Sequence, residues 1–207
     1  MTTMAVQRTS CIEWSVASRA LPGEASSGDL HLVTPARAGV LVAVVDGLGH
    51  GVEATAAAQI AVNLLHEHAG ESVIALAQHC HRGLRETRGV VMTLMTIEPD
   101  ESRVMTLGIG NVETMLFRAN PRVQPQRLGV LLRGGVVGYQ LPALHASVWP
   151  ISVDDVVVFA TDGLREDFGD GVNPADSVVQ VVDRVMAQKF RGTDDGLVLA
   201  CKYLGRP

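Results

Sequence analysis

The sequence predicts an α/β (α+β) domain in which two antiparallel sheets pack together, with helices on the outside. Expected strands fall into two groups along the chain, and each group is followed by segments with the hydrophobic spacing of helices. The size agrees, because 207 residues with 47% hydrophobic and 19% charged side chains can bury a substantial core. Without any low-complexity linker, residues 1–207 are expected to form one domain.

The first group of strands lies in the N-terminal quarter of the chain, at 12–18, 29–34 and 40–45. The β-branched run at 40–45 is typical of a strand that is buried on both faces. Because residues 35–39 offer only a short connection, the second and third strands should pair antiparallel. Two helices should follow, since apolar residues recur at helical spacing over 57–65 and 73–84.

The second group of strands fills most of the remaining chain. A hairpin is expected around Pro99-Asp100-Glu101, and a helix after Asn173, Pro174 and Asp176, carrying an apolar stripe from Val178 to Met186. The expected strands are 90–97, 103–109, 112–118, 128–132, 144–148, 156–160 and 197–203.

Composition and charge exclude several classes of protein. A net charge of −5 argues against a general nucleic-acid binder, and the longest clear apolar run, 40–45, is far shorter than the roughly 20 residues of a membrane span. Residues 1–10 lack the apolar core of a signal peptide, and three widely spaced cysteines do not suggest a disulfide framework. We therefore expect a cytoplasmic protein, without nucleic acid or membrane as partners, and nothing requires more than a monomer.

Acidic residues adjoin four of the expected strands. Asp46 and Asp162 each follow a strand, whereas Asp29 and the pair Asp194-Asp195 each precede one. The start of one strand and the end of its antiparallel neighbour lie at the same edge of a sheet. Asp29 should therefore lie beside Asp46, and Asp162 beside Asp194 if their strands are neighbours.

Carboxylates gathered at one edge repel each other unless a cation or a shared proton compensates. Oxygen ligands of this kind favour Mg²⁺ or Mn²⁺, and two such ions about 3.5–4 Å apart can activate water against a phosphate ester. The alternative is that Asp-Gly after a strand marks an ordinary turn with a solvated acid. The near-duplicate segments 44–48 and 160–164 favour the metal site, but spacing alone leaves both open.

Several segments resemble the motifs of one phosphatase family. Asp46-Gly47-Leu48-Gly49-His50-Gly51, continuing to Ala54, resembles the Asp-Gly-x-Gly-His-Gly-x-x-Ala segment of bacterial SpoIIE-type phosphatases, which belong to the metal-dependent PPM class of serine/threonine protein phosphatases. Ser27-Gly28-Asp29 resembles their first acidic motif, Ala160-Thr161-Asp162-Gly163-Leu164 their third, and Asp194-Asp195 their last. The motifs follow the family order and span residues 27–200.

The resemblance implies a four-layer α-β-β-α sandwich that holds two divalent cations, Mn²⁺ rather than Mg²⁺, at one edge. It also implies hydrolysis of phosphoserine or phosphothreonine by direct attack of water, without a phosphoenzyme. Asp46, Asp162 and Asp194 would be the catalytic residues. Asp46 would bridge the two cations with help from the Gly47 carbonyl, Asp162 and Asp194 would hold one of them, and Asp29 would be a ligand or orient water.

One departure from the family pattern concerns the last acidic pair. Gly196 and Leu197 stand where relatives place a hydrophobic residue and Thr. Either Asp194 or Asp195 could therefore be the ligand, and its position in the motif favours Asp194.

Length and general likeness narrow the resemblance to the short stressosome phosphatases of this class. The implied partners are phosphorylated stressosome scaffold and antagonist proteins, RsbR-like and RsbS-like, and the implied role is to reset a stress-signalling pathway. Two alternatives stay open. The chain could be a catalytically silent phosphoprotein-binding module of the same fold, or a SpoIIE/RsbU-like phosphatase acting on an anti-sigma-factor antagonist.

Further candidates carry less weight. His50 could contact substrate or fix the start of the first helix, and Arg19 is a candidate phosphate-binding residue by position only. The glycines around His50 lack the Lys-Ser/Thr of a nucleotide-binding loop, and no Gly-x-Ser-x-Gly occurs. A zinc site is disfavoured because His66 and His68 point in different directions on a helix. The histidines and cysteine considered for it are His66, His68, His79, Cys80 and His81.

Overall fold

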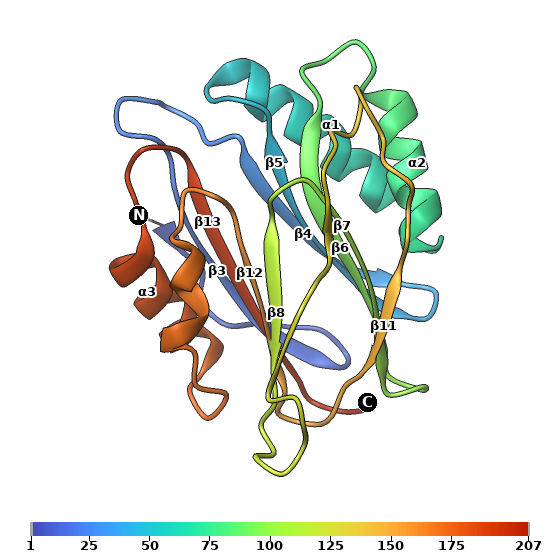
Figure 1. The fold of residues 1–207 in the computed structure, drawn as a ribbon, viewed down its shortest axis with the longest axis vertical. Coiled ribbons are helices and arrows are strands. Elements are labelled where there is room, and N and C mark those ends of the chain that lie inside the picture. The colour runs from blue at the N-terminus through green and yellow to red at the C-terminus, as the bar shows by residue number, and fades with distance from the viewer. Residues whose placement is uncertain (1, 207) are drawn as a thin grey trace.

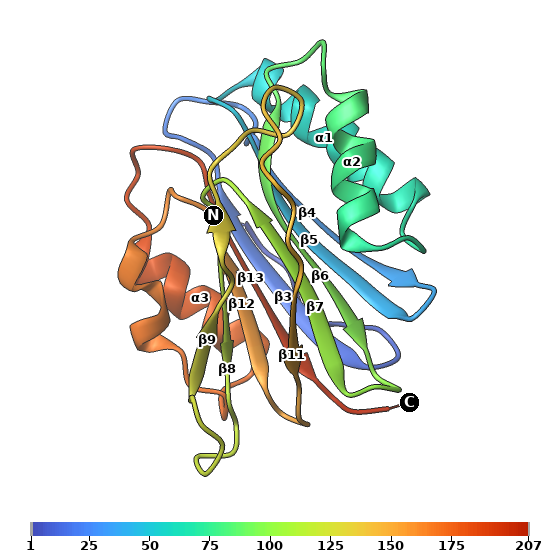
Figure 2. The same ribbon diagram turned by 45° about the vertical axis from the view of Figure 1, so that its right-hand side comes forward.

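A computed structural model describes residues 2–206. Two sheets pack face to face, and helices cover both outer faces, as Figures 1 and 2 show. The predicted α-β-β-α sandwich is confirmed, and with it the fold class read from the two groups of strands.

The first sheet has seven strands, and every pairing in it is antiparallel. Its strands come from both ends of the sequence, because the first and last long strands, β3 and β13, lie side by side. In spatial order they are β1 (Thr2–Thr3), β3 (Ile12–Arg19), β13 (Gly196–Tyr203), β12 (Val156–Ala160), β8 (Glu113–Phe117) and β9 (Arg127–Gly129), with β2 (Gln7–Arg8) also paired to β3.

Among the described residues, the second sheet has six strands, and only the pairing of β10 with β7 is parallel. In spatial order they are β10 (Leu132–Arg133), β7 (Arg103–Ile109), β6 (Val90–Glu98), β5 (Gly39–Gly47) and β4 (Asp29–Ala36), with β11 (Ser147–Pro150) also paired to β7.

Helices cover the outer face of each sheet. On the second sheet lie α1 (Val52–Glu67) and α2 (Val73–Gly83), side by side in Figure 2. On the first sheet lie α3 (Val178–Lys189) and a 3₁₀ helix, η1 (Glu166–Gly171). None of the helices within residues 2–206 is long and apolar enough to cross a membrane.

Strand β5 confirms the prediction of a strand buried on both faces. Val40, Val42 and Val44 point into the core between the two sheets, whereas alternate residues face α1 and α2. Because successive side chains of a strand point to opposite faces, an uninterrupted apolar run suits a strand with a core on each side. This central position brings the end of β5 to the edge where the acidic residues gather.

Two predicted strands need correction, whereas the helix predicted after Asp176 is confirmed as α3. The expected strand 128–132 is two short strands, β9 and β10, in different sheets, and the expected strand 144–148 begins only at Ser147. Ahead of that helix, the Asn173 side chain accepts a hydrogen bond from the backbone N–H of Ala175 and closes a turn. The strands β1 and β2 and the helix η1 were not predicted, since each is short and lacks a hydrophobic period.

Ser177 is the N-cap of α3, and its side chain and that of Gln180 form a capping box. We expect Ser177→Ala to lower the free energy of unfolding by about 1 kcal/mol, because the backbone N–H of Gln180 loses its acceptor. Urea unfolding measures this loss. Gln188→Ala, an exposed change on the same helix, should stay within about 0.5 kcal/mol of wild type. Equal stability of the two variants would contradict the cap.

Candidate metal centre

Strand register brings the predicted acidic residues to one edge of the molecule. In the antiparallel pair β4–β5, Asp29 is the direct partner of Asp46, which confirms their predicted adjacency. In the other sheet, β12 and β13 are antiparallel neighbours, so the segment after β12 with Asp162 adjoins the segment before β13 with Asp194. The edge therefore receives acids from both sheets of the sandwich.

Three of these carboxylates line one cavity of about 280 Å³. Asp46 comes from β5, whereas Asp162 and Asp194 come from loops next to β12 and β13. The remaining lining residues are Leu48, Gly49, Val91, Asn111 and Val136. The cavity thus collects oxygen donors from segments more than 100 residues apart in the sequence.

Burial of these carboxylates works against their ionisation. Burial, together with the negative charges of Asp29 and Asp162, raises the pKa of Asp46 to about 9. Burial also raises the pKa of Asp29 to about 8, against the lowering effect of a hydrogen bond from Thr161. The pKa of Asp162 is raised by burial and by Asp194. Close acids with raised pKa values are a feature of sites that act on charged groups.

Asp29 lies behind the cavity and is 4% exposed. The Thr161 hydroxyl donates to its Oδ2 at 2.7 Å and accepts the N–H of Leu197 at 2.8 Å. This hydroxyl therefore ties the first residue of β4, in one sheet, to the second residue of β13, in the other. Sequence reasoning gave Thr161 no such role.

Asn111 is a second residue that sequence reasoning missed. Its Nδ2 donates to Asp162 Oδ2 at 2.8 Å, and its side chain lines the cavity. Asn111 follows the buried strand β7 after one glycine, much as Asp162 follows β12 after one threonine. The sequence feature that could have indicated Asn111 is therefore a polar residue just past a buried strand, a feature that we applied to acidic residues alone.

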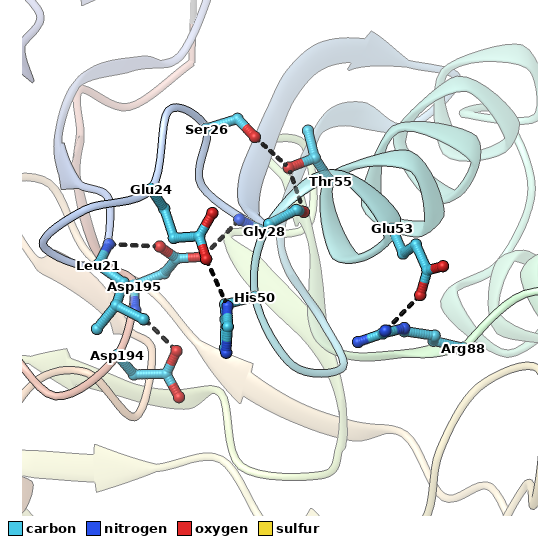
Figure 3. A network of polar contacts seen from close by, with 11 residues as sticks. Leu21, Glu24, Ser26, Gly28, His50, Glu53, Thr55, Arg88, Asp194 and Asp195 are labelled. Carbon is cyan, nitrogen blue, oxygen red and sulfur yellow. Dashed lines mark hydrogen bonds and ion pairs between the residues drawn. The ribbon is translucent and has the colours of Figure 1, made fainter.

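The two adjacent acids before β13 have different surroundings, which Figure 3 shows. Asp195 is 3% exposed, and its carboxylate accepts the backbone N–H groups of Leu21 at 2.7 Å and Gly28 at 2.6 Å. Both Asp195 oxygens therefore hold the loop that precedes β4. Asp194 instead accepts the N–H of Asp195 with one oxygen, at 2.8 Å, and lines the cavity.

The glycines that follow Asp46 and Asp162 are required by space. A Cβ on Gly47 would lie 2.2 Å from the carbonyl oxygen of Ala54, in the first turn of α1. A Cβ on Gly163 would lie 1.8 Å from the carbonyl oxygen of Asp195. The Asp-Gly repeats thus let backbone segments pack closely around the acids, and they do not mark ordinary exposed turns.

His50 and Arg19 lie near the acidic edge but outside the lining of the cavity. His50 Nδ1 contacts Glu24 Oε1 at 2.8 Å, and the next residue, Gly51, is the N-cap of α1. Arg19 ends β3, and its guanidinium lies 5.2 Å above the centre of the Phe190 ring.

The rim of the site is further held by polar contacts from α1, also drawn in Figure 3. The Thr55 hydroxyl bonds to the side chain of Ser26, and Glu53 forms an ion pair with Arg88. The loop before β4 and the start of α1 are therefore joined beside the acids.

The donor set fits divalent cations. Every candidate ligand is an oxygen: the carboxylates of Asp46, Asp162 and Asp194 and the backbone carbonyl of Gly47. Hard cations such as Mg²⁺ and Mn²⁺ prefer oxygen, and buried like charges need a compensating positive charge. Within residues 2–206, no three of these acids bring oxygens within 4.8 Å of one another, so the set is wider than the ligand shell of one ion.

The fold and the acidic edge define a PP2C-like α+β protein. The chain belongs to the SpoIIE family (Stage II sporulation protein E), whose match covers residues 36–203. The predicted resemblance to SpoIIE-type PPM phosphatases is thereby confirmed. A search of curated protein sequences found no significant match.

Solved structures agree with this assignment. A structure from work on "the bacterial stressosome: a modular system that has been adapted to control secondary messenger signaling" has a TM-score of 0.82 and 26% identity, covering 92% of this chain and 99% of that one. RsbX in complex with magnesium has a TM-score of 0.85 and 18% identity, covering 96% and 98%. The serine/threonine phosphatase PstP/Ppp of Mycobacterium tuberculosis has a TM-score of 0.70 and 16% identity, covering 95% and 100%. The expected likeness to the short stressosome phosphatases is confirmed.

Proposed function

We propose that this protein is a divalent-cation-dependent phosphatase that hydrolyses phosphoserine or phosphothreonine on proteins. The observation that carries the proposal is the cavity lined by Asp46, Asp162 and Asp194 at the shared edge of both sheets. Membership of the SpoIIE family supports it. A silent phosphoprotein-binding module is disfavoured, because such a module would not need a set of buried acids that repel each other.

Each acid has a proposed role. Asp46 would bridge two cations together with the Gly47 carbonyl, and Asp162 and Asp194 would hold the second of them. When bound, such cations polarise phosphate oxygens and lower the pKa of water. Asn111 would orient the Asp162 carboxylate through its hydrogen bond. Asp29, which pairs with Asp46 in the sheet, would be a ligand or orient a water molecule next to Asp46. Engagement of both Asp195 oxygens by backbone N–H groups supports Asp194 as the ligand.

A second cavity of about 130 Å³ shares Asp162 with the metal centre. Arg165 and Arg191 line it, and guanidinium groups bind phosphate oxygens well. Glu113 and Glu166 also line it, so the lining carries charges of both signs. We propose that Arg165 and Arg191 contact the substrate. Arg19, the candidate phosphate-binding residue from the sequence, instead has its guanidinium over the Phe190 ring.

The proposed substrates are phosphorylated stressosome proteins, RsbR-like scaffolds and RsbS-like antagonists. Support comes from the similarity to RsbX and to the stressosome-related structure, which extends over nearly the whole of each chain. We propose Mn²⁺ over Mg²⁺ as the cofactor, although the oxygen donors suit both ions. A cytoplasmic location is proposed as well, in keeping with three free, buried cysteines.

Turnover of a small phosphate ester tests the enzyme class. We expect p-nitrophenyl phosphate to be hydrolysed in the presence of Mn²⁺ or Mg²⁺, and hydrolysis to cease in EDTA. No turnover with either ion would favour the binding module. Phosphorylated RsbR-like and RsbS-like proteins, followed by mass spectrometry, then test the substrate. Faster dephosphorylation of a phosphorylated anti-sigma-factor antagonist would favour the SpoIIE/RsbU-like alternative.

A further inference from the structure

Outside the acidic edge, two histidines and a glutamate meet where α1 turns into α2. His68 is the C-cap residue of α1, Glu71 lies in the turn, and His79 lies in α2. His68 Nδ1 is 3.2 Å from Glu71 Oε1, and His79 Nε2 is 3.0 Å from Glu71 Oε2. The two imidazole rings stack, with centroids 4.0 Å apart and planes 14° apart. Nitrogen atoms from both rings therefore face one carboxylate.

This cluster is compact enough for one metal ion. Within residues 2–206, it is the one set of three His, Cys, Asp or Glu side chains whose ligand atoms all lie within 4.8 Å of one another. Metal–nitrogen and metal–oxygen bonds of about 2.0–2.2 Å are shorter than these contacts, so the partly exposed side chains would close around the ion. The stacked rings would turn away from each other so that their nitrogen lone pairs meet at one point. We propose that His68, Glu71 and His79 bind a transition-metal ion such as Zn²⁺.

The other histidines considered from the sequence have different partners. His66 Nδ1 is 3.3 Å from the Thr34 hydroxyl, and His81 Nδ1 accepts the N–H of Gly138 at 3.0 Å. His66 and His68 point in different directions, as expected, and it is His79 of the next helix that meets His68. The turn between the helices, which the sequence did not specify in detail, brings His79 to His68.

The backbone already holds these three residues in place. The N–H of Glu71 donates to the carbonyl of His68 at 2.9 Å, and Ser72 caps α2 by accepting the N–H of Ala75. The buried face of α2 packs on the sheet through Val73, Leu76, Ala77 and Cys80. His79 lies beside this buried face and its side chain is 28% exposed, so a metal ion could reach it from solvent.

Nitrogen ligands separate this site from the acidic edge. Imidazole and one carboxylate favour Zn²⁺, Ni²⁺ or Cu²⁺, whereas sites made of oxygen ligands favour Mg²⁺ and Mn²⁺. The two sites are also distant, because the 16 residues of α1 span about 24 Å between its start beside the acids and its end at His68. An excess of Mg²⁺ should therefore occupy the acidic edge and leave the His–Glu cluster available to Zn²⁺.

A substitution of Arg82 should strengthen zinc binding, in contrast to substitutions of the histidines. Its Nη2 lies 3.0 Å from His79 Nδ1. Arginine can only donate, so Nδ1 accepts, and the ring proton is on Nε2, facing Glu71. For Zn²⁺ to bind Nε2, that proton must move to Nδ1, where it would face the guanidinium of Arg82. Arg82 must then turn away, so its charge and its hydrogen bond both oppose metal binding.

Zinc affinity, measured by competition with a chromophoric chelator in excess Mg²⁺, tests the site. We expect wild type to bind one equivalent of Zn²⁺, His68→Ala and His79→Ala to weaken binding at least about tenfold, and Arg82→Ala to strengthen it. His145→Ala, an exposed histidine far along the chain, is the matched control and should bind as wild type.

Two results would overturn the site: wild-type zinc affinity in both His68→Ala and His79→Ala, or no zinc bound by the wild-type protein. Circular dichroism checks that each variant is folded, which is expected because both side chains are partly exposed. A second readout is the melting temperature. Zn²⁺ should raise it for wild type but not for His79→Ala, because a ligand of the native state stabilises that state.

Discussion

Asp46→Asn should reduce kcat/KM for p-nitrophenyl phosphate by at least about 10³-fold at saturating Mn²⁺. Asp46 lines the cavity together with Asp162 and Asp194, whose charges act on it, and it is the direct partner of Asp29 in the pairing of β4 with β5. Asparagine keeps the shape but removes the negative charge, and a loss of about 4 kcal/mol of cation-dependent stabilisation corresponds to this factor. Asp162→Asn should have a similar effect.

The fold should survive these substitutions. Burial makes the charged form of Asp46 unfavourable, so the metal-free folded state must hold a proton there that the unfolded chain releases. Asparagine is neutral without that proton, so Asp46→Asn should be at least as stable as wild type in EDTA, as measured by urea unfolding. Asp100→Asn is the matched control, because Asp100 is 88% exposed in the hairpin at the opposite end of β6. It should keep full activity. Wild-type activity in both Asp46→Asn and Asp162→Asn would refute the assigned metal centre.

The stability of the metal-free protein should fall as the pH rises. The pKa of Asp29 is about 8 and that of Asp46 about 9 in the folded protein, both raised mainly by burial. An unfolded aspartate has a pKa near 4, so between about pH 4 and pH 9 the folded state holds protons that the unfolded state releases. The stabilising effect of these two groups is complete below about pH 4 and is lost as the pH passes 8 to 9. Each proton held only by the folded state lowers the free energy of unfolding by about 1.4 kcal/mol for each pH unit of increase.

Urea unfolding in EDTA at pH 6 and pH 8 measures this slope, and Asp46→Asn should make it shallower. Saturating Mn²⁺ should also reduce it, because cation binding competes with protons and strengthens as the pH rises. Asp100→Asn again serves as the control and should keep the wild-type slope. An equal slope in wild type and Asp46→Asn, both without metal, would show that Asp46 is ionised in the folded protein.

Much of the acidic edge could be predicted from local sequence. The β-branched run of β5 and the short connection before it indicated a buried hairpin, and the register of that hairpin alone sets Asp29 opposite Asp46. The ordered Asp-Gly motifs indicated the family, which the match over residues 36–203 confirmed. These features depend on neighbours in the sequence or on one antiparallel pair, so simple alternation and spacing rules reach them.

Residues whose roles depend on packing between the two sheets could not be found in this way. Thr161 meets Asp29 across 132 positions of sequence, and Asn111 meets Asp162 across 51. The different surroundings of Asp194 and Asp195 likewise depend on a distant loop that donates two N–H groups to one of them.

The sequence by itself determined the long strands, the three α-helices and which acids the chain supplies, because hydrophobic period and strand-end position are local properties. Only the tertiary structure decided which oxygens face a common cavity, which carboxylate is consumed in holding a loop, and that His68 meets His79. Those outcomes depend on the angle and distance at which separately formed layers pack. No local pattern encodes them, since the contacting atoms become neighbours only after the apolar faces between them have been buried.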